Sequence, residues 1–76
     1  MITVKLYGLL RLDSGIREHT LEADSLRQVL EGLARLGIDR KVLSGCVILV
    51  NGTPGTKRTK LKPGDLVQLL PPVAGG

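Results

Sequence analysis

The chain has 76 residues, a net charge of +4 and one aromatic residue, Tyr7. A chain of this length forms one domain and buries only about 60% of its unfolded surface, so its core has to be lean and aliphatic. One cysteine excludes an internal disulfide, no apolar run reaches the roughly 20 residues that span a bilayer, and the inventory of acid, base and nucleophile side chains is poor for an enzyme.

The first 21 residues are predicted to form a hairpin. Residues 2–7 alternate apolar and polar side chains with a period of two, which predicts a half-buried strand. Gly8 ends this strand, and an apolar segment over residues 9–15 closes with the turn signal Asp13-Ser14-Gly15. Residues 16–21 are more polar, and we expect them to form the second strand.

One helix is predicted between Ser25 and Gly37. Either Asp24 or Ser25 can cap its N-terminus, and Ser25 with Gln28 fits the S-x-x-Q capping box. Apolar residues then recur at i, i+3, i+4 and i+7 at Leu26, Val29, Leu30 and Leu33. A single apolar stripe suits a helix that covers one face of a sheet, and Gly37 is placed to end it.

The second half of the chain is predicted to supply the remaining strands. Residues 38–45 are predicted to connect the helix to the next strand, with a helical turn around residues 40–43. The apolar run 46–50 predicts a central strand that ends in the turn Asn51-Gly52. Residues 53–62 hold at most one short edge strand, and residues 66–70 form the last strand. This order predicts an α+β fold of the ubiquitin-like β-grasp type, with one main helix on a mixed sheet of four or five strands.

A basic cluster is formed by Lys57, Arg58, Lys60 and Lys62. Nucleic-acid binding is one interpretation, but no aromatic residues interleave with the cluster for base stacking and no recognition helix carries it. A solvated hairpin turn is the favoured interpretation, and a docking surface for an acidic partner stays open. We expect no nucleic-acid and no membrane partner.

The sequence ends with two glycines after Pro71-Pro72. Glycine has no Cβ, so Gly75 and Gly76 can lie flat against a partner's backbone, whereas ordering them costs entropy and buries no apolar surface. We expect a folded domain over residues 1–70 and a flexible tail over residues 71–76. Fully extended, this tail would reach roughly 20 Å, and its prolines favour polyproline II geometry directed away from the domain.

Four motifs follow one another along nearly the whole chain: Tyr7-Gly8 with Leu10-Arg11, Val50-Asn51-Gly52, Pro63-Gly64-Asp65-Leu66-Val67, and the run from Leu69 to Gly76. Each is common alone, but together they resemble the MoaD/ThiS family of sulfur-carrier proteins. The double proline before Val-Ala-Gly-Gly favours the molybdopterin branch over the thiamine branch.

The resemblance implies a carrier without an active site of its own. A separate ATP-dependent activating enzyme would adenylate Gly76, and a sulfur donor would displace AMP to leave a thiocarboxylate. The sulfur would pass to an acceptor, and the favoured one is the molybdopterin precursor in a larger catalytic subunit such as that of molybdopterin synthase. The chain has no phosphate-cradling Gly-rich loop, Walker lysine or paired acids for Mg²⁺. We expect no cofactor, no metal site and a cytoplasmic location.

The candidate site residues come from this resemblance and from strand parity. Gln68 is polar and should face solvent, so Leu70, two residues on, should share its exposed face and contact a partner; an isolated surface leucine is an equal alternative. Arg11 matches the family position where a basic residue meets the activating enzyme. The expected tail residues are Val73, Ala74, Gly75 and Gly76, and the expected partner contacts are Leu70, Pro71, Pro72 and Arg11.

Three other side chains are given no chemical role. Cys46 starts an apolar strand and is expected to be buried and inert. His19 has no second His or Cys at a ligand spacing and is expected to be an exposed strand residue. Tyr7 should cap the apolar face or lie at the sheet surface.

Three rival functions stay open. The chain could carry sulfur for thiamine, cysteine or tRNA thiolation. It could instead be a protein modifier, joined through Gly76 to a lysine by an isopeptide bond. A basic nucleic-acid-binding module would bind with a steep salt dependence that does not require Gly76.

Overall fold

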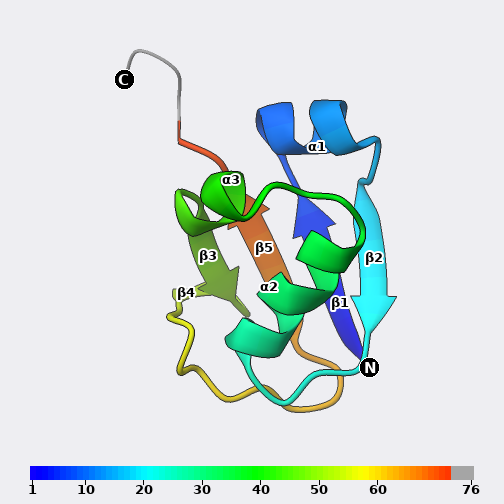
Figure 1. The fold of residues 1–76 in the computed structure, drawn as a ribbon. Coiled ribbons are helices and arrows are strands. Elements are labelled where there is room, and N and C mark those ends of the chain that lie inside the picture. Colours follow the sequence, from blue (N-terminus) through cyan, green and yellow to red (C-terminus); the bar gives the residue numbers. More distant parts are fainter. Residues whose placement is uncertain (73–76) are drawn as a thin grey trace.

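A five-stranded mixed sheet organises the chain, and the computed structural model describes residues 1–72 (Figure 1). The strands lie in the order β2-β1-β5-β3-β4, with β5 parallel to β1 and antiparallel to β3. The elements in chain order are β1 (Ile2–Leu6), α1 (Gly8–Ser14), β2 (Glu18–Leu21), α2 (Leu26–Arg35), α3 (Arg40–Ser44), β3 (Val47–Val50), β4 (Thr53–Pro54) and β5 (Leu66–Leu70). The predicted α+β class and mixed sheet are confirmed.

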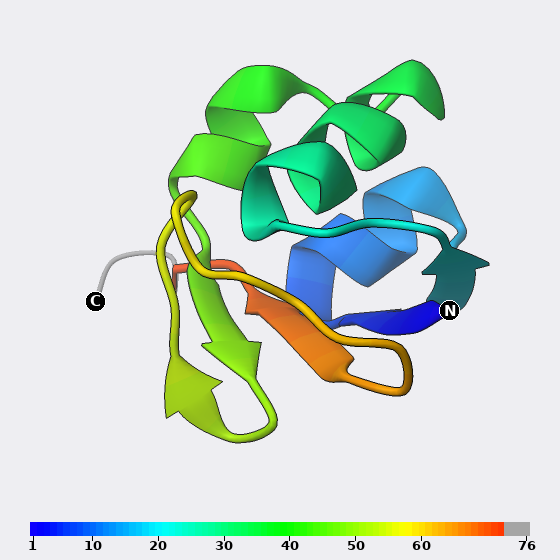
Figure 2. The ribbon, with the colours of Figure 1, turned by 90° about the horizontal axis from the view of Figure 1, so that it is seen from below.

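The core lies between the sheet and α2. The predicted apolar stripe of α2 is buried, and it meets alternate side chains of β1 and β5. Burying one such aliphatic side chain stabilises the fold by about 1.5–3 kcal/mol, so this layer supplies most of the driving force. Figure 2 shows α2 and α3 on one side of the sheet, with the opposite side left open.

The start of α2 follows its sequence signature closely. Ser25 is the N-cap, and its Oγ accepts a hydrogen bond from the Gln28 backbone N at 3.5 Å. The Gln28 side chain bonds back to the Asp24 backbone N at 2.6 Å. Both residues proposed as caps therefore take part in capping the helix, because the Gln28 side chain accepts from the backbone N of Asp24 and not from that of Ser25. The helix ends at Arg35, two residues before Gly37, whose φ is 101°.

The helix α1 was not anticipated, and residues 9–15 form more than an apolar connection with a turn. Its last turn closes through the Gly15 backbone N, which donates to the Arg11 carbonyl at 2.9 Å. Only Leu10 is buried, while Leu9 and Leu12 are 59% and 73% exposed. A seven-residue helix with one buried side chain has no 3.6-residue apolar period to detect.

The basic segment 57–62 is also placed differently from the prediction. It is not a hairpin turn but runs past the N-terminus of α2. The first two amides of that helix, Leu26 N and Arg27 N, donate to Thr59 O at 3.0 Å and Lys57 O at 3.3 Å. The short strand β4 before it confirms the single brief edge strand that was expected.

The turn Asn51-Gly52 is fastened to the start of β5 through Asp65. The Asn51 side chain donates to one Asp65 oxygen at 3.0 Å, and the Lys62 backbone N donates to the other at 2.8 Å. These hydrogen bonds, the backbone one first, hold the Asp65 pKa below its ordinary value of 3.8. The carboxylate therefore stabilises the folded state only while it is ionised.

We predict that this contribution is complete above pH 3.8 and is lost as the pH falls through the lowered pKa of folded Asp65. Thermal melts of the wild type and Asp65→Asn between pH 2 and 7 measure it. The variant should melt at the lower temperature at neutral pH, and the two curves should converge at the acid end. A gap that stays constant across this range would contradict the prediction.

Candidate functional site

The base of the C-terminal tail is held at the centre of the sheet. β5 pairs with β1 on one side up to Leu69 and with β3 on the other up to Leu70. Beyond it, Pro71 packs against Gly8, where an added methyl group would lie 3.1 Å from the Pro71 Cγ. Gly8 also has a φ of 60°, in the left-handed region that favours glycine. The chain therefore leaves the sheet through a close contact with the start of α1.

The open face of the sheet carries an apolar strip where β5 ends, formed by Val47, Leu49 and Leu70. In strand register Val47 pairs with Leu70 and Leu49 pairs with Gln68, so these side chains share the face away from α2. Val67 and Leu69, which alternate with Gln68 and Leu70 along β5, are fully buried on the other face. The predicted parity of β5 is confirmed, although Leu70 is half-buried and not fully exposed.

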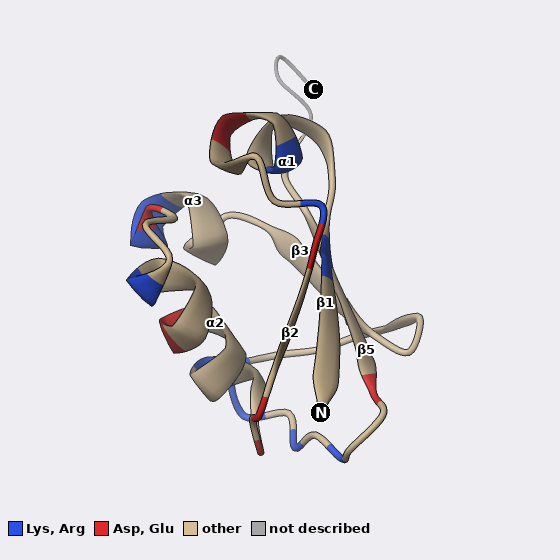
Figure 3. Cartoon of the chain, turned by 90° about the vertical axis from the view of Figure 1, so that its right-hand side faces the viewer, with Lys and Arg blue, Asp and Glu red and all other residues tan. Residues whose placement is uncertain are grey.

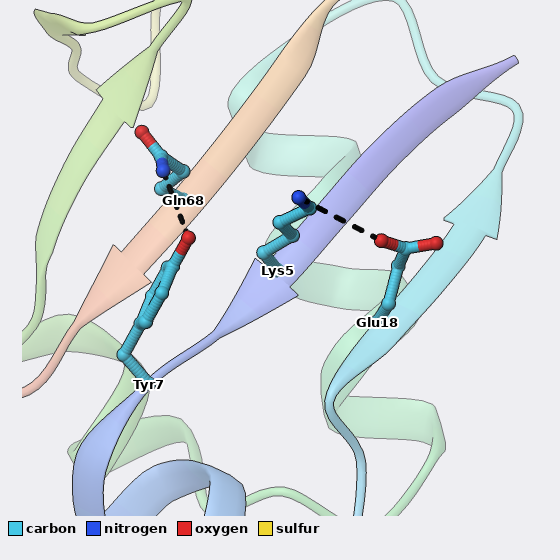
Figure 4. Close-up of polar contacts among 4 residues, drawn as sticks. All are labelled: Lys5, Tyr7, Glu18 and Gln68. Atoms are coloured by element: carbon cyan, nitrogen blue, oxygen red, sulfur yellow. Dashed lines mark hydrogen bonds and ion pairs between the residues drawn. The ribbon is translucent and has the colours of Figure 1, made fainter.

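Polar side chains continue the open face across β1 and β2. The Gln68 Nε2 donates to the Tyr7 hydroxyl at 2.9 Å, and Lys5 faces Glu18 across the strand pair with a separation of 4.0 Å (Figure 4). Tyr7 therefore lies at the sheet surface, which was one of the two positions predicted for it. The exposed Lys5–Glu18 pair contributes little to stability.

Arg11 does not act alone in this region. It lines a hollow of about 390 Å³ together with Lys5, Arg17, Tyr7 and Glu18. The antiparallel pairing of β1 with β2 brings Arg17 and Lys5 to the same place as α1. Three cations against one carboxylate make this hollow electropositive, which suits an acidic group of a partner. Only Arg11 was predicted from the sequence, because the positions of Lys5 and Arg17 depend on the register between β1 and β2.

Exposed apolar side chains gather at the end of the molecule where β5 finishes. α1 and α3 lie at that end (Figure 1). Leu9 and Leu12 on α1, Val42 on α3 and Val47 at the start of β3 are all exposed large hydrophobic residues. Apolar surface concentrated at one end is typical of an interaction site. None of these four side chains was predicted as a contact, and the two on α1 belong to a helix that was not predicted.

The residues given no chemical role are placed as follows. Cys46 is half-buried and not buried as expected; its thiol donates to the Val42 carbonyl at 3.2 Å, and burial raises its pKa. A raised pKa keeps the thiol protonated and poorly nucleophilic. His19 is half-buried, not exposed, and its pairing with Val4 puts it on the helix face of the sheet.

The tail itself is only partly described. Pro71 is half-buried and Pro72 exposed, while the predictions for Val73, Ala74, Gly75 and Gly76 lie outside residues 1–72. Within those 72 residues no group of three or more His, Cys, Asp or Glu side chains could hold a metal ion. None of the helices described there is long and apolar enough to cross a membrane.

Solved structures of similar shape are small proteins that match this chain almost end to end. Subunit 1 in the complex of subunits 1 and 2 of molybdopterin-converting factor from Helicobacter pylori 26695 is 28% identical, with a TM-score of 0.76, over 99% of this chain and 97% of that one. Small archaeal modifier protein 1 from Methanosarcina acetivorans is also 28% identical, with a TM-score of 0.85, over 99% and 95%.

A third structure is similar to this chain in fold alone. A chain of the BexX/CysO complex from Amycolatopsis orientalis has a TM-score of 0.82 at 21% identity, with complete coverage of both chains. The comparison with curated protein sequences gave no significant match.

The family assignment comes from the sequence as a whole. The fold is the ubiquitin-like β-grasp of the sulfur carriers, with TM-scores of 0.82 and 0.85 to two structures of small archaeal modifier protein 1. The model of the ThiS family matches residues 4–76, from the first strand through both terminal glycines. The chain therefore belongs to the ThiS family of small ubiquitin-like carrier proteins.

Proposed function

We propose that this protein is a sulfur carrier whose reactive group is the carboxylate of Gly76. The observation that carries the proposal is the family match, which extends through Gly75 and Gly76. Three features of the fold support it: the tail follows the central strand, an apolar strip adjoins the exit, and an electropositive hollow lies nearby. The strip and the hollow offer a partner apolar and charged surface for binding, and the central strand leads directly into the tail that the partner would receive.

The chemistry proceeds in two steps on a separate activating enzyme. A carboxylate oxygen of Gly76 attacks the α-phosphorus of ATP and pyrophosphate leaves, which gives an acyl-adenylate. A sulfide-level donor then attacks the acyl carbon, and AMP departs with the former carboxylate oxygen. The product is a C-terminal thiocarboxylate, a soft nucleophile that holds sulfur on the protein until an acceptor takes it.

The acceptor we favour is the molybdopterin precursor, with this chain as the small subunit of a molybdopterin synthase. Supporting observations are the double proline before the tail and the similarity to subunit 1 of molybdopterin-converting factor, whose solved structure is a complex with subunit 2. A protein modifier joined through Gly76 is the second candidate, supported by the equal 28% identity to a small archaeal modifier protein.

Intact-mass spectrometry tests the proposal. The protein is purified with its native C-terminus from a host that contains its activating enzyme. Replacement of one oxygen by sulfur, mapped to Gly76, is the expected result. A ladder of higher-mass conjugates on a blot would favour the modifier. An unmodified mass under conditions that charge a known carrier would remove the basis of the proposal.

Arg11→Glu tests the electropositive hollow. We predict that affinity for the activating enzyme falls about tenfold, chiefly through slower association, because the substitution reverses a charge at the rim of the interface. The melting temperature should not change, since Arg11 is exposed. The matched control is Arg35→Glu, also exposed, at the end of α2. Equal losses in both variants, measured by surface plasmon resonance at two salt concentrations, would contradict a specific role for Arg11.

A further inference from the structure

Three basic side chains from separate parts of the chain meet on the helical side of the molecule. Arg27 of α2, Arg40 of α3 and Lys57 of the loop after β4 line a hollow of about 290 Å³ with Leu30 and Glu31. An adjoining hollow of about 50 Å³ shares Leu30, Arg40 and Lys57 and reaches Leu43 and Ser44. We call the two together the basic groove. Figure 3 shows basic positions on α2, on α3 and on the loop that passes the N-terminal end of α2.

The loop that carries Lys57 is fixed in place. Its carbonyls at Lys57 and Thr59 accept the first two amides of α2. Within the loop, the Thr59 hydroxyl accepts from Thr56 N at 2.9 Å, and Thr59 N donates to Thr56 O at 2.9 Å. Gly55 packs so closely on α2 that an added methyl group would lie 2.8 Å from a Leu26 methyl carbon. A loop held this way loses little backbone entropy on binding, so the backbone that carries Lys57 is already in place for a ligand.

The charge of the basic groove is not neutralised within the described chain. The ion pairs among residues 1–72 join the N-terminus to Glu22 and Lys5 to Glu18, and none involves Arg27, Arg40 or Lys57. Glu31 lines the same hollow but does not come within ion-pair distance of these cations. Below them Leu30 and Leu43 are buried and form an apolar floor.

We infer that the basic groove binds an acidic peptide segment of a protein partner. Carboxylates of the segment would pair with Arg27, Arg40 and Lys57, while an apolar side chain between them would rest on Leu30. The residues that line the groove favour a peptide over a nucleic acid. None is aromatic, so bases have no stacking surface.

The position of the basic groove separates it from the proposed sulfur-carrier site. The groove lies on α2 and α3, on the covered side of the sheet, whereas Val47, Leu49 and Leu70 lie on the open side. A partner held in the groove therefore leaves the end of β5 and the apolar strip accessible. The inference does not depend on whether Gly76 carries sulfur, so either can fail without the other.

Titration of the ¹⁵N-labelled full chain with a synthetic peptide tests the inference by NMR. The probe is Gly-Glu-Asp-Leu-Asp-Glu-Gly, blocked at both ends, and the control peptide has glutamine for its central leucine. At about 0.1 M salt, charges more than about 10 Å apart are largely screened, so changes report local contacts. We expect the amide signals of Arg27, Leu30, Arg40 and Lys57 to move and those of Leu49 and Gln68 to stay, with weaker binding of the glutamine peptide.

Charge reversals provide the decisive comparison. Arg40→Glu and Lys57→Glu should each weaken peptide binding at least tenfold, and both side chains are exposed, so folding should be preserved. Lys60→Glu makes the same charge change on the same loop outside both hollows, and its affinity should stay within threefold of the wild type. Equal losses in all three variants, shifts centred on the open face, or tighter binding of a single-stranded DNA decamer than of the peptide would overturn the inference.

Discussion

Gly75→Val is expected to lower the rate of thiocarboxylate formation by about 100-fold while the domain stays folded. If the activating enzyme receives the tail in a narrow channel, a branched side chain beside Gly76 would displace the carboxylate from the α-phosphorus of ATP. A misplacement of about 1 Å in such a geometry can cost a factor of about 100 in rate. Single-turnover loading followed by intact-mass spectrometry measures the effect.

The matched control is Thr53→Val, which introduces the same side chain at an exposed position on the edge strand β4. It should load at the wild-type rate, and both variants should keep the wild-type melting temperature. Loading of Gly75→Val at the wild-type rate would show that the channel is not narrow and would remove the steric role proposed for the terminal glycines.

Adjacent leucines of β5 are expected to respond in opposite ways to substitution. Leu69 is fully buried under α2, so Leu69→Ala should destabilise the domain by about 3 kcal/mol through lost burial and a residual cavity. For a domain of this size that corresponds to a fall in melting temperature of roughly 12–24 °C. Differential scanning calorimetry measures it directly.

Leu70→Glu should leave the melting temperature within a few degrees of the wild type but weaken binding to the activating enzyme by about 100-fold. Leu70 lies in the apolar strip opposite Val47, so docking of the enzyme would bury the new carboxylate without a partner. Isothermal titration calorimetry with the activating enzyme measures the loss. If Leu70→Glu unfolds the domain, Leu70 is structural; if it binds normally, the open face is not the docking surface.

The parts of the fold that the sequence predicted are those with a strong apolar period or clear boundaries. β1 alternates apolar and polar residues, and α2 carries four apolar residues at helical spacing with a cap before them. β5 is an apolar run between a turn and two prolines. Parity also placed Leu70 on the correct face of β5. The helix α1 escaped because only Leu10 is buried, so its segment has no period. The path of residues 57–62 depends on backbone hydrogen bonds to α2, which no side-chain pattern encodes.

The candidate site was predictable only where it is local in sequence. Pro71 and Pro72 follow directly from the end of β5, and Arg11 came from the family resemblance. The positions of Lys5 and Arg17 beside Arg11 could not be predicted, because the pairing of β1 with β2 brings these residues together. The basic groove likewise combines α2, α3 and a distant loop. Such sites depend on tertiary contacts between segments whose sequences carry no common signal.

The central place of β5 also determines how the protein bears a pulling force. If a partner draws the tail into a channel, as proposed for the activating enzyme, the pull acts on β5 along its length. This strand is hydrogen-bonded on both sides, to β1 and to β3, and its last residues are backed by the bond from Tyr7 N to Leu69 O at 3.2 Å. Tension along the strand is shared by many bonds in shear and does not peel them away one at a time. The domain therefore provides an anchor from which the tail can be stretched without the sheet coming apart.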